Sequence, residues 1–124
     1  MCFSDSVQES EANNDTGSAD SVPITAGGTA SFCGVIDSAT DVDYLTFTLP
    51  AGVTEMGLHR YGDTTSPNSP DLQATPSIDG TDFPFGGPYP TVQTGKPYYL
   101  KVFTKAKAPI KYRIVICAHG GSCP

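Results

Sequence analysis

Apolar and polar residues alternate along several stretches of this chain, and this period constrains the fold more than any other feature. In residues 43–49 (DYLTFTL), Leu45, Phe47 and Leu49 fall on one face of an extended backbone. Successive side chains of a strand point to opposite faces, so the pattern predicts a β-strand with one buried face. The same reasoning predicts strands at residues 29–36, 53–59, 97–104 and 110–117.

The residues between these stretches favour turns over helices. The chain of 124 residues contains 13 glycines and 11 prolines, and six of the prolines lie between residues 61 and 95. Both residue types interrupt helices, and no stretch shows a helical stripe. A loop spanning 61–95 without structure would be unusual, so we expect at least one strand there. Together these patterns predict an all-β fold, an antiparallel β-sandwich.

Charges are segregated along the chain. All 13 carboxylates lie between Asp5 and Asp82, whereas six of the seven cations lie between Lys96 and Arg113. The net charge of −6 excludes a general nucleic-acid binder, which needs excess cations on its binding face. The segregation predicts that the two portions attract each other or serve different partners. No apolar stretch reaches the length of about 18 residues that a membrane-spanning helix needs.

Residues 1–22 differ from the rest of the chain. They are rich in Ser, Asp, Glu and Asn, and they contain few large apolar residues. Such a segment buries too little surface to offset the entropy lost on ordering. We therefore expect a flexible acidic tail or linker over residues 1–22 and the β-sandwich domain over residues 23–124.

Four cysteines, Cys2, Cys33, Cys117 and Cys123, predict disulfides and an oxidising, extracellular compartment. They form no CxxC pair, and the two histidines lack ligand spacing, so a zinc site is not expected. Cys33 and Cys117 both fall off the predicted core faces, and a Cys33–Cys117 bond fits if the first and last strands pair. In that case Cys2 and Cys123 could pair with each other. Alternatively, Cys2 is the lipidated first residue of a bacterial lipoprotein, and Met1 stands in place of its signal peptide. Sequence leaves the three possible pairings open.

A cationic hairpin is predicted near the C-terminus, and two interpretations of it remain open. Its cations are Lys101, Lys105, Lys107, Lys111 and Arg113, which point away from the core or lie in the connecting turn. The candidate binding surface comprises Lys101, Phe103, Lys105, Lys111 and Arg113. The hairpin is either a docking surface for an anionic partner, such as an acidic polysaccharide or lipid head groups, or a solvated face that discourages edge-to-edge aggregation. The aromatic residues of FPFGGPYP (83–90) form either a second platform or a loop folded on the sandwich.

The chain lacks the residues expected of an enzyme. His59 and His119 stand without a recognisable nucleophile motif. Asp41 and Asp43 are two residues apart, so both face the same way on one strand, which suits metal binding or turn capping better than acid–base chemistry. We therefore expect no catalytic activity.

Three motifs, in the same order, resemble those of the bacterial pre-peptidase C-terminal domain. The segment Glu9-Ser-Glu11-Ala-Asn13-Asn14-Asp15 resembles the opening acidic motif of that family. The segment 41–52 (DVDYLTFTLPAG) resembles its D-x-D-x-Y/F-x-F strand, and 95–102 (GKPYYLKV) with 112–115 (YRIV) resembles its final strands. The match covers about residues 9–117 and is poor between 61 and 94.

The resemblance implies a jelly-roll-like sandwich and, in collagen-binding members, calcium where the N-terminal linker meets the first strands. Carried over, the candidate ligands are Glu9, Glu11, Asn13, Asn14, Asp41 and Asp43. Calcium prefers this mixture of carboxylate and amide oxygens. The alternative is a solvated acidic linker followed by Asp residues that cap turns. Only Phe103 occupies one of the aromatic positions that contact ligand in collagen-binding relatives.

The sequence thus predicts a secreted, non-catalytic binding or accessory module at the cell surface or outside the cell. It would tether or position itself on a protein or polysaccharide partner, and it would contact a membrane only through a lipid on Cys2. The alternative is a free-standing bacterial lipoprotein or a structural subunit of an extracellular assembly. Either way, no nucleic-acid partner is expected.

Overall fold

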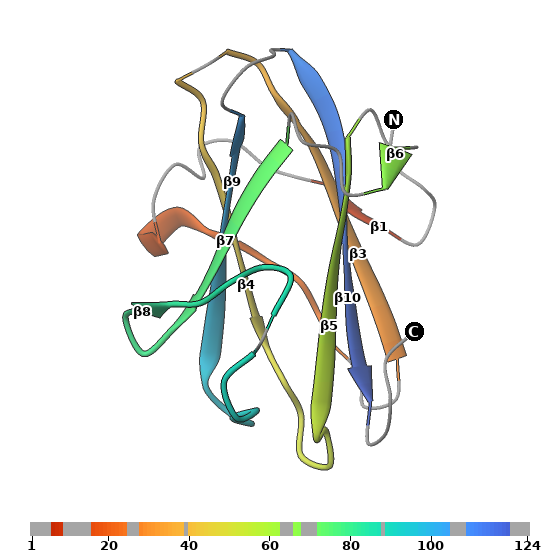
Figure 1. Cartoon of the computed structure of the whole chain (residues 1–124), viewed down its shortest axis with the longest axis vertical. Helices are drawn as coiled ribbons and strands as arrows, with labels where there is room; N and C mark the ends of the chain where they lie inside the picture. Colours follow the sequence, from red (N-terminus) through yellow and green to blue (C-terminus); the bar gives the residue numbers. More distant parts are fainter. Residues whose placement is uncertain are drawn as a thin grey trace.

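Two β-sheets pack face to face (Figure 1). The computed structural model describes residues 6–8, 16–24, 28–38, 40–62, 66–67, 72–87, 89–104 and 109–119. We call the sheets A and B. The predicted all-β sandwich is confirmed, and none of the described segments forms a helix that could cross a membrane.

The predicted first and last strands are hydrogen-bonded neighbours in sheet A. In spatial order its strands are β1 (Ser6–Gln8), β3 (Gly28–Ile36), β10 (Ile110–His119), β5 (Glu55–Gly62) and β6 (Ser66–Pro67). β10 is central and antiparallel to both β3 and β5. β10 therefore pairs with a neighbouring strand on both sides along most of its length.

Sheet B holds the strand expected within the proline-rich region. In spatial order its strands are β2 (Asp20–Ser21), β4 (Asp43–Thr48), β9 (Pro97–Thr104), β7 (Leu72–Ile78) and β8 (Thr81–Asp82). β7 and β8 are joined by a two-residue turn with positive φ at both Asp79 (53°) and Gly80 (75°). Asp-Gly is the sequence that such a tight hairpin turn favours, because both residues tolerate left-handed φ.

The core lies between the sheets and is built from the faces that the alternation predicts. Phe47 and Tyr98, opposite each other on β4 and β9, stack with ring centroids 5.2 Å apart. Each fully buried side chain of this size contributes roughly 1.5–3 kcal/mol to stability. The other predicted inward side chains are also buried: Phe32, Ile36, Leu45, Leu49, Met56, Leu58, Leu100, Val102, Tyr112, Ile114 and Ile116.

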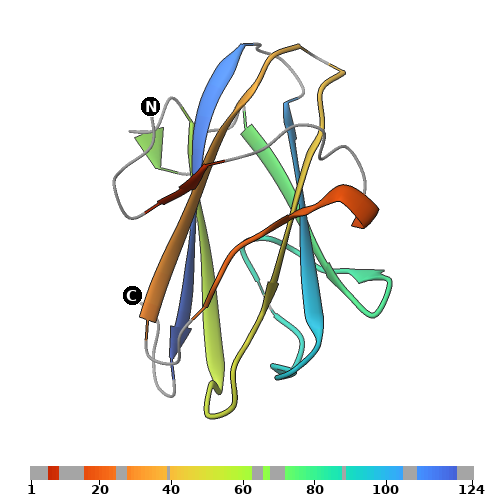
Figure 2. The same ribbon diagram turned by 180° about the vertical axis from the view of Figure 1, so that it is seen from behind.

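The segment predicted as a tail contributes an edge strand to each sheet. β1 pairs in parallel with β3, and β2 pairs in parallel with β4 beside the short 3₁₀ helix η1 (Thr16–Ser18), as Figure 2 shows. Val22 follows β2, is 2% exposed and donates its backbone amide to the Thr46 carbonyl (2.9 Å). Edge pairing uses backbone groups, so a segment poor in apolar side chains can still join a sheet.

Candidate functional site

Asp43, a predicted calcium ligand, is buried between the two sheets. It is the first residue of β4 and is 0% exposed. The hydroxyl of Tyr112, on β10 in the other sheet, donates a 2.7 Å hydrogen bond to Asp43 Oδ2. A buried polar group is costly unless it is hydrogen-bonded, so this contact makes the carboxylate part of the packing between the sheets.

Asp41, the second described candidate ligand, caps the loop that precedes β4. Its Oδ2 accepts a 2.9 Å hydrogen bond from the backbone amide of Asp37. Its own amide donates to the Ser38 carbonyl at 3.1 Å, which closes the turn. Asp41 therefore caps a turn, which is the role predicted from the sequence as the alternative to binding a metal.

The other calcium candidates, Glu9, Glu11, Asn13 and Asn14, lie outside the described residues. Within the described part of the chain, no group of three or more His, Cys, Asp or Glu side chains is arranged to hold a metal ion. Asp41 and Asp43 are therefore the only candidates that the described residues place, and each already has a hydrogen-bond partner. Calcium binding stays a prediction.

The pairing of Cys33 with Cys117 is excluded by the register of their strands. Cys33 lies opposite Arg113, four residues from Cys117, which lies opposite Thr29. Four residues of strand span roughly 13 Å, whereas the Cα atoms of a disulfide lie within about 7 Å. The predicted Cys33–Cys117 bond is therefore wrong. Neither residue is a free thiol, and Cys2 and Cys123 lie outside the described residues.

The predicted cationic hairpin is also wrong, because β9 and β10 belong to different sheets. Both strands turn their apolar faces toward the shared core, so their outward faces point away from each other. Lys101 and Phe103 lie on the outer face of sheet B, and Lys111 and Arg113 lie on the outer face of sheet A. Lys105 lies in the undescribed connection. The five residues predicted as one surface thus do not form one.

Contact between the acidic and basic portions of the chain is seen at one end of sheet B. Lys96 Nζ lies 3.1 Å from Asp79 Oδ2, and both side chains are about half exposed (51% and 55%). Exposed ion pairs of this kind contribute about 0–1 kcal/mol. The attraction that the sequence predicts therefore adds little here to the stability of the fold.

The outer face of sheet B carries a row of aromatic residues. Along β9, Tyr99, Lys101 and Phe103 alternate with the buried Tyr98, Leu100 and Val102. On β4, Tyr44 lies directly opposite Lys101. We call this surface the aromatic face. Its side chains are partly exposed: Tyr44, Thr46, Gln73, Thr75, Ser77, Tyr99, Lys101 and Phe103.

Lys101 stands at the centre of the aromatic face. Its Nζ lies 5.2 Å from the centroid of the Phe103 ring, within the range of a cation–π contact. Thr75 on β7 lies opposite it on the other side. The lysine is the one charged side chain that the outer faces of β4, β9 and β7 carry along their described lengths. An ammonium group among rings and hydroxyls can bind an anion while the rings stack on a ligand.

The outer face of sheet A is different, because its central positions are buried. Ser31, Cys33 and Cys117 point away from the core, yet they are only 8%, 4% and 2% exposed. Arg113 packs its guanidinium over the ring of Tyr61 at 4.3 Å. Along the described strands, the centre of the outer face is therefore more accessible on sheet B than on sheet A.

The FPFGGPYP segment folds onto the sandwich and does not form an aromatic platform. Phe85 is 7% exposed, and the Tyr89 hydroxyl donates to the Phe85 carbonyl at 2.8 Å. The same hydroxyl accepts the Leu58 amide of β5 at 3.3 Å. The ring of Phe83 packs edge-on against Tyr89 and Tyr98. The interpretation of this segment as a loop folded on the sandwich is confirmed.

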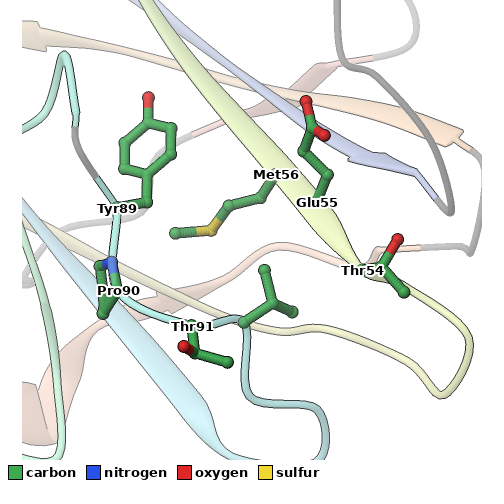
Figure 3. Close-up of a pocket in the computed structure, with 7 residues that line it drawn as sticks. Thr54, Glu55, Met56, Tyr89, Pro90 and Thr91 are labelled. Atoms are coloured by element: carbon green, nitrogen blue, oxygen red, sulfur yellow. The ribbon is translucent and has the colours of Figure 1, made fainter.

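An open pocket of about 370 Å³ lies where this segment passes the start of β5 (Figure 3). Met56 extends from β5 toward Pro90 and Tyr89, while Glu55 points away from them. The lining residues are Thr54, Glu55, Met56, Tyr89, Pro90, Thr91 and Val92. Sequence reasoning missed this pocket because its two sides are distant in the chain. They include no His, Cys or Lys, so the pocket offers no pairing of a strong nucleophile with a base.

Sequence reasoning did not include Tyr44 and Tyr99 among the candidate binding residues, although the signal was present. Each is adjacent in its strand to residues predicted to be in the core. Because successive side chains of a strand point to opposite faces, Tyr44 and Tyr99 must point away from the core. No model of a known protein family and no curated protein sequence matches the chain. The resemblance to pre-peptidase C-terminal domains therefore stays a prediction.

Proposed function

We propose that this chain is a non-catalytic, secreted binding module of the pre-peptidase C-terminal type, which attaches to a polymer or surface through the aromatic face. The observation that carries the proposal is the partial exposure of Tyr44, Tyr99 and Phe103 on the outer face of one sheet. Exposed aromatic rings are costly to leave in water, and they are enriched where proteins bind ligands.

The contrast between the two outer faces supports this choice of surface. On sheet B the rings are accessible, whereas on sheet A the central side chains Ser31, Cys33 and Cys117 are buried. A strand face is also rigid, so rings on it lose little conformational entropy when a ligand binds. Calcium bound by the acidic N-terminal segment would stabilise the module without taking part in this contact.

A co-sedimentation assay tests the proposal. The full chain is mixed with insoluble polymers of different chemistry: cellulose, chitin, cross-linked pectate and collagen fibres. We expect binding to at least one, and its loss in a variant with Tyr44→Ser, Tyr99→Ser and Phe103→Ser. Tyr61→Ser, on the outer face of sheet A, is the matched control. Binding to none of the four, or unchanged binding of the triple variant, would contradict the proposal.

A further inference from the structure

The charge at the centre of the aromatic face selects among the polymers that such a face could bind. Lys101 lies between Tyr99 and Phe103 on β9, and two residues of strand span roughly 6.6 Å. The Cα atoms of Tyr99 and Phe103 therefore lie at about the same distance on either side of Lys101, and the ammonium group itself packs over the Phe103 ring, 5.2 Å from its centroid. A ligand that stacks on either ring brings its substituents toward Lys101.

Lys101 has no carboxylate beside it on the described outer faces of the three central strands. Its cross-strand neighbours are Tyr44 and Thr75, and its Nζ packs against the Phe103 ring. Among the described residues that share this outer face, the register places one carboxylate two strands away, that of Asp82 on the edge strand β8, opposite Ser77, which in turn lies opposite Tyr99. In a chain with a net charge of −6, this face is a local site of positive charge.

We propose that the aromatic face binds a polysaccharide that carries uronic-acid carboxylates, with the sugar rings on Tyr99 and Phe103 and a carboxylate on Lys101. The inference rests on the proposed function and names its ligand class. The carboxylate of a pyranuronic acid projects from the edge of the sugar ring. A sugar stacked on either ring can therefore be oriented with that carboxylate beside the aromatic ring, on the side of Lys101.

The number of charges favours a uronate over a heavily sulfated chain. One lysine serves two exposed rings on β9, which matches a polymer with no more than about one charge per sugar. A polymer with several sulfates per repeat would need a cluster of cations to neutralise it, and Asp82 at the edge of the sheet would repel it. Thr75 and Ser77 supply hydroxyls that can bond to sugar hydroxyls.

Affinity electrophoresis of the full chain tests this ligand. The probes are polygalacturonate, its fully methyl-esterified form and dextran sulfate. The first two differ only at the carboxyl group, which is charged in the acid form and capped by a methyl group in the ester. We expect retardation by polygalacturonate and roughly tenfold weaker binding of the ester, the size expected for one charge-assisted hydrogen bond. Raising the salt concentration should weaken binding to the acid form only.

Substitution of the lysine locates the contact. Lys101→Met keeps an apolar stem and removes the charge, and Lys111→Met on the outer face of sheet A is the matched control. We expect Lys101→Met to reduce the affinity for polygalacturonate about tenfold and to leave the affinity for the ester unchanged. Equal binding of acid and ester, preference for dextran sulfate, or an unaffected Lys101→Met variant would overturn the inference.

The two proposals fail in different ways. If the triple aromatic variant loses binding while Lys101→Met does not, the aromatic face binds a polymer but the uronate inference is wrong. If no polymer binds wild-type protein, the proposed function is wrong as well. Thermal melts of each variant show whether it is folded, and Lys101 is partly exposed, so its substitution should leave the melting temperature within a few degrees.

Discussion

Tyr112 donates a 2.7 Å hydrogen bond to Asp43, and both side chains are fully buried. The tyrosine comes from the central strand of sheet A and the aspartate from the start of β4 in sheet B. The bond therefore joins the two sheets through the core, where most other contacts are apolar. Because hydrogen bonds are directional, this pair fixes how one sheet sits on the other more tightly than apolar packing alone.

Replacement of Tyr112 by Phe should lower the free energy of unfolding by about 2 kcal/mol, because it leaves a buried oxygen of Asp43 without its donor. Tyr98→Phe is the matched control, because Tyr98 is equally buried and its hydroxyl accepts a bond only from the neutral Gln93 amide. We expect about 1 kcal/mol for that variant. Urea denaturation measures both, and equal losses would contradict a special role for the Tyr112–Asp43 pair.

Calcium should raise the melting temperature if the acidic N-terminal segment binds it. A metal at a hundred times its dissociation constant adds about 2.7 kcal/mol, so melts with calcium and with EGTA should differ by several degrees. Asp41→Asn is the variant to test, because Asp41 is only partly buried and its amide oxygen can still accept the Asp37 bond. An Asp43 variant is unsuitable, since losing the Tyr112 contact destabilises the fold with or without metal.

If calcium binds through Asp41, Asp41→Asn should reduce the difference between the two melts. Its melting temperature in EGTA should equal that of wild type, because the cap is kept. Identical melts of wild-type protein in calcium and in EGTA would end the calcium prediction.

The strands and their inward faces could be predicted from the sequence, but the sheet to which each strand belongs could not. The alternation in β9 and β10 correctly identifies Leu100 and Ile114 as core residues. It does not say whether the two strands are neighbours, because facing strands of a sandwich have the same period as paired ones. That ambiguity produced the incorrect cationic hairpin.

The edge strands and the loop contacts could not be predicted from the sequence, for a different reason. β1 and β2 are held by backbone hydrogen bonds to β3 and β4, which carry no side-chain signature. Asp43 was recognised as unusual from its motif, but its partner Tyr112 lies 69 residues away and only the fold brings them together. Of the candidate binding residues, Lys101 and Phe103 are on one surface, and Tyr44 completes it across the strand pair.

Peptide mapping should show that Cys33 and Cys117 are bound to different partners. The chain has four cysteines, and neither of these two is a free thiol in the structure. Because their register forbids a mutual bond, we expect each to be linked to Cys2 or Cys123. Cleavage after Glu9 separates Cys2 from Cys33, and mass-spectrometric fragmentation separates Cys117 from Cys123. A Cys33–Cys117 peptide would contradict the register, and a lipid on Cys2 would support the lipoprotein alternative.

Replacement of Tyr89 by Phe should loosen the segment that covers the start of β5. The Tyr89 hydroxyl bonds to both the Leu58 amide and the Phe85 carbonyl, so its removal leaves two partly buried backbone groups without that partner. We expect a loss of about 1–3 kcal/mol in stability, the cost of unsatisfied buried groups. The local signature is faster hydrogen exchange at Leu58, whose amide faces the edge of β5 away from β10.

Lys96→Met is the control for that variant. Lys96 follows the 83–92 segment in the sequence, and its exposed ion pair with Asp79 contributes little to the stability of the fold. Exchange at Ile114, within the central strand β10, should stay slow in both variants unless the whole fold is lost. Equal acceleration at Leu58 and Ile114 would mean that Tyr89→Phe destabilises the sandwich globally. Acceleration confined to Leu58 would show that the Tyr89 hydroxyl holds the 83–92 segment against β5 and thereby shapes the pocket between them.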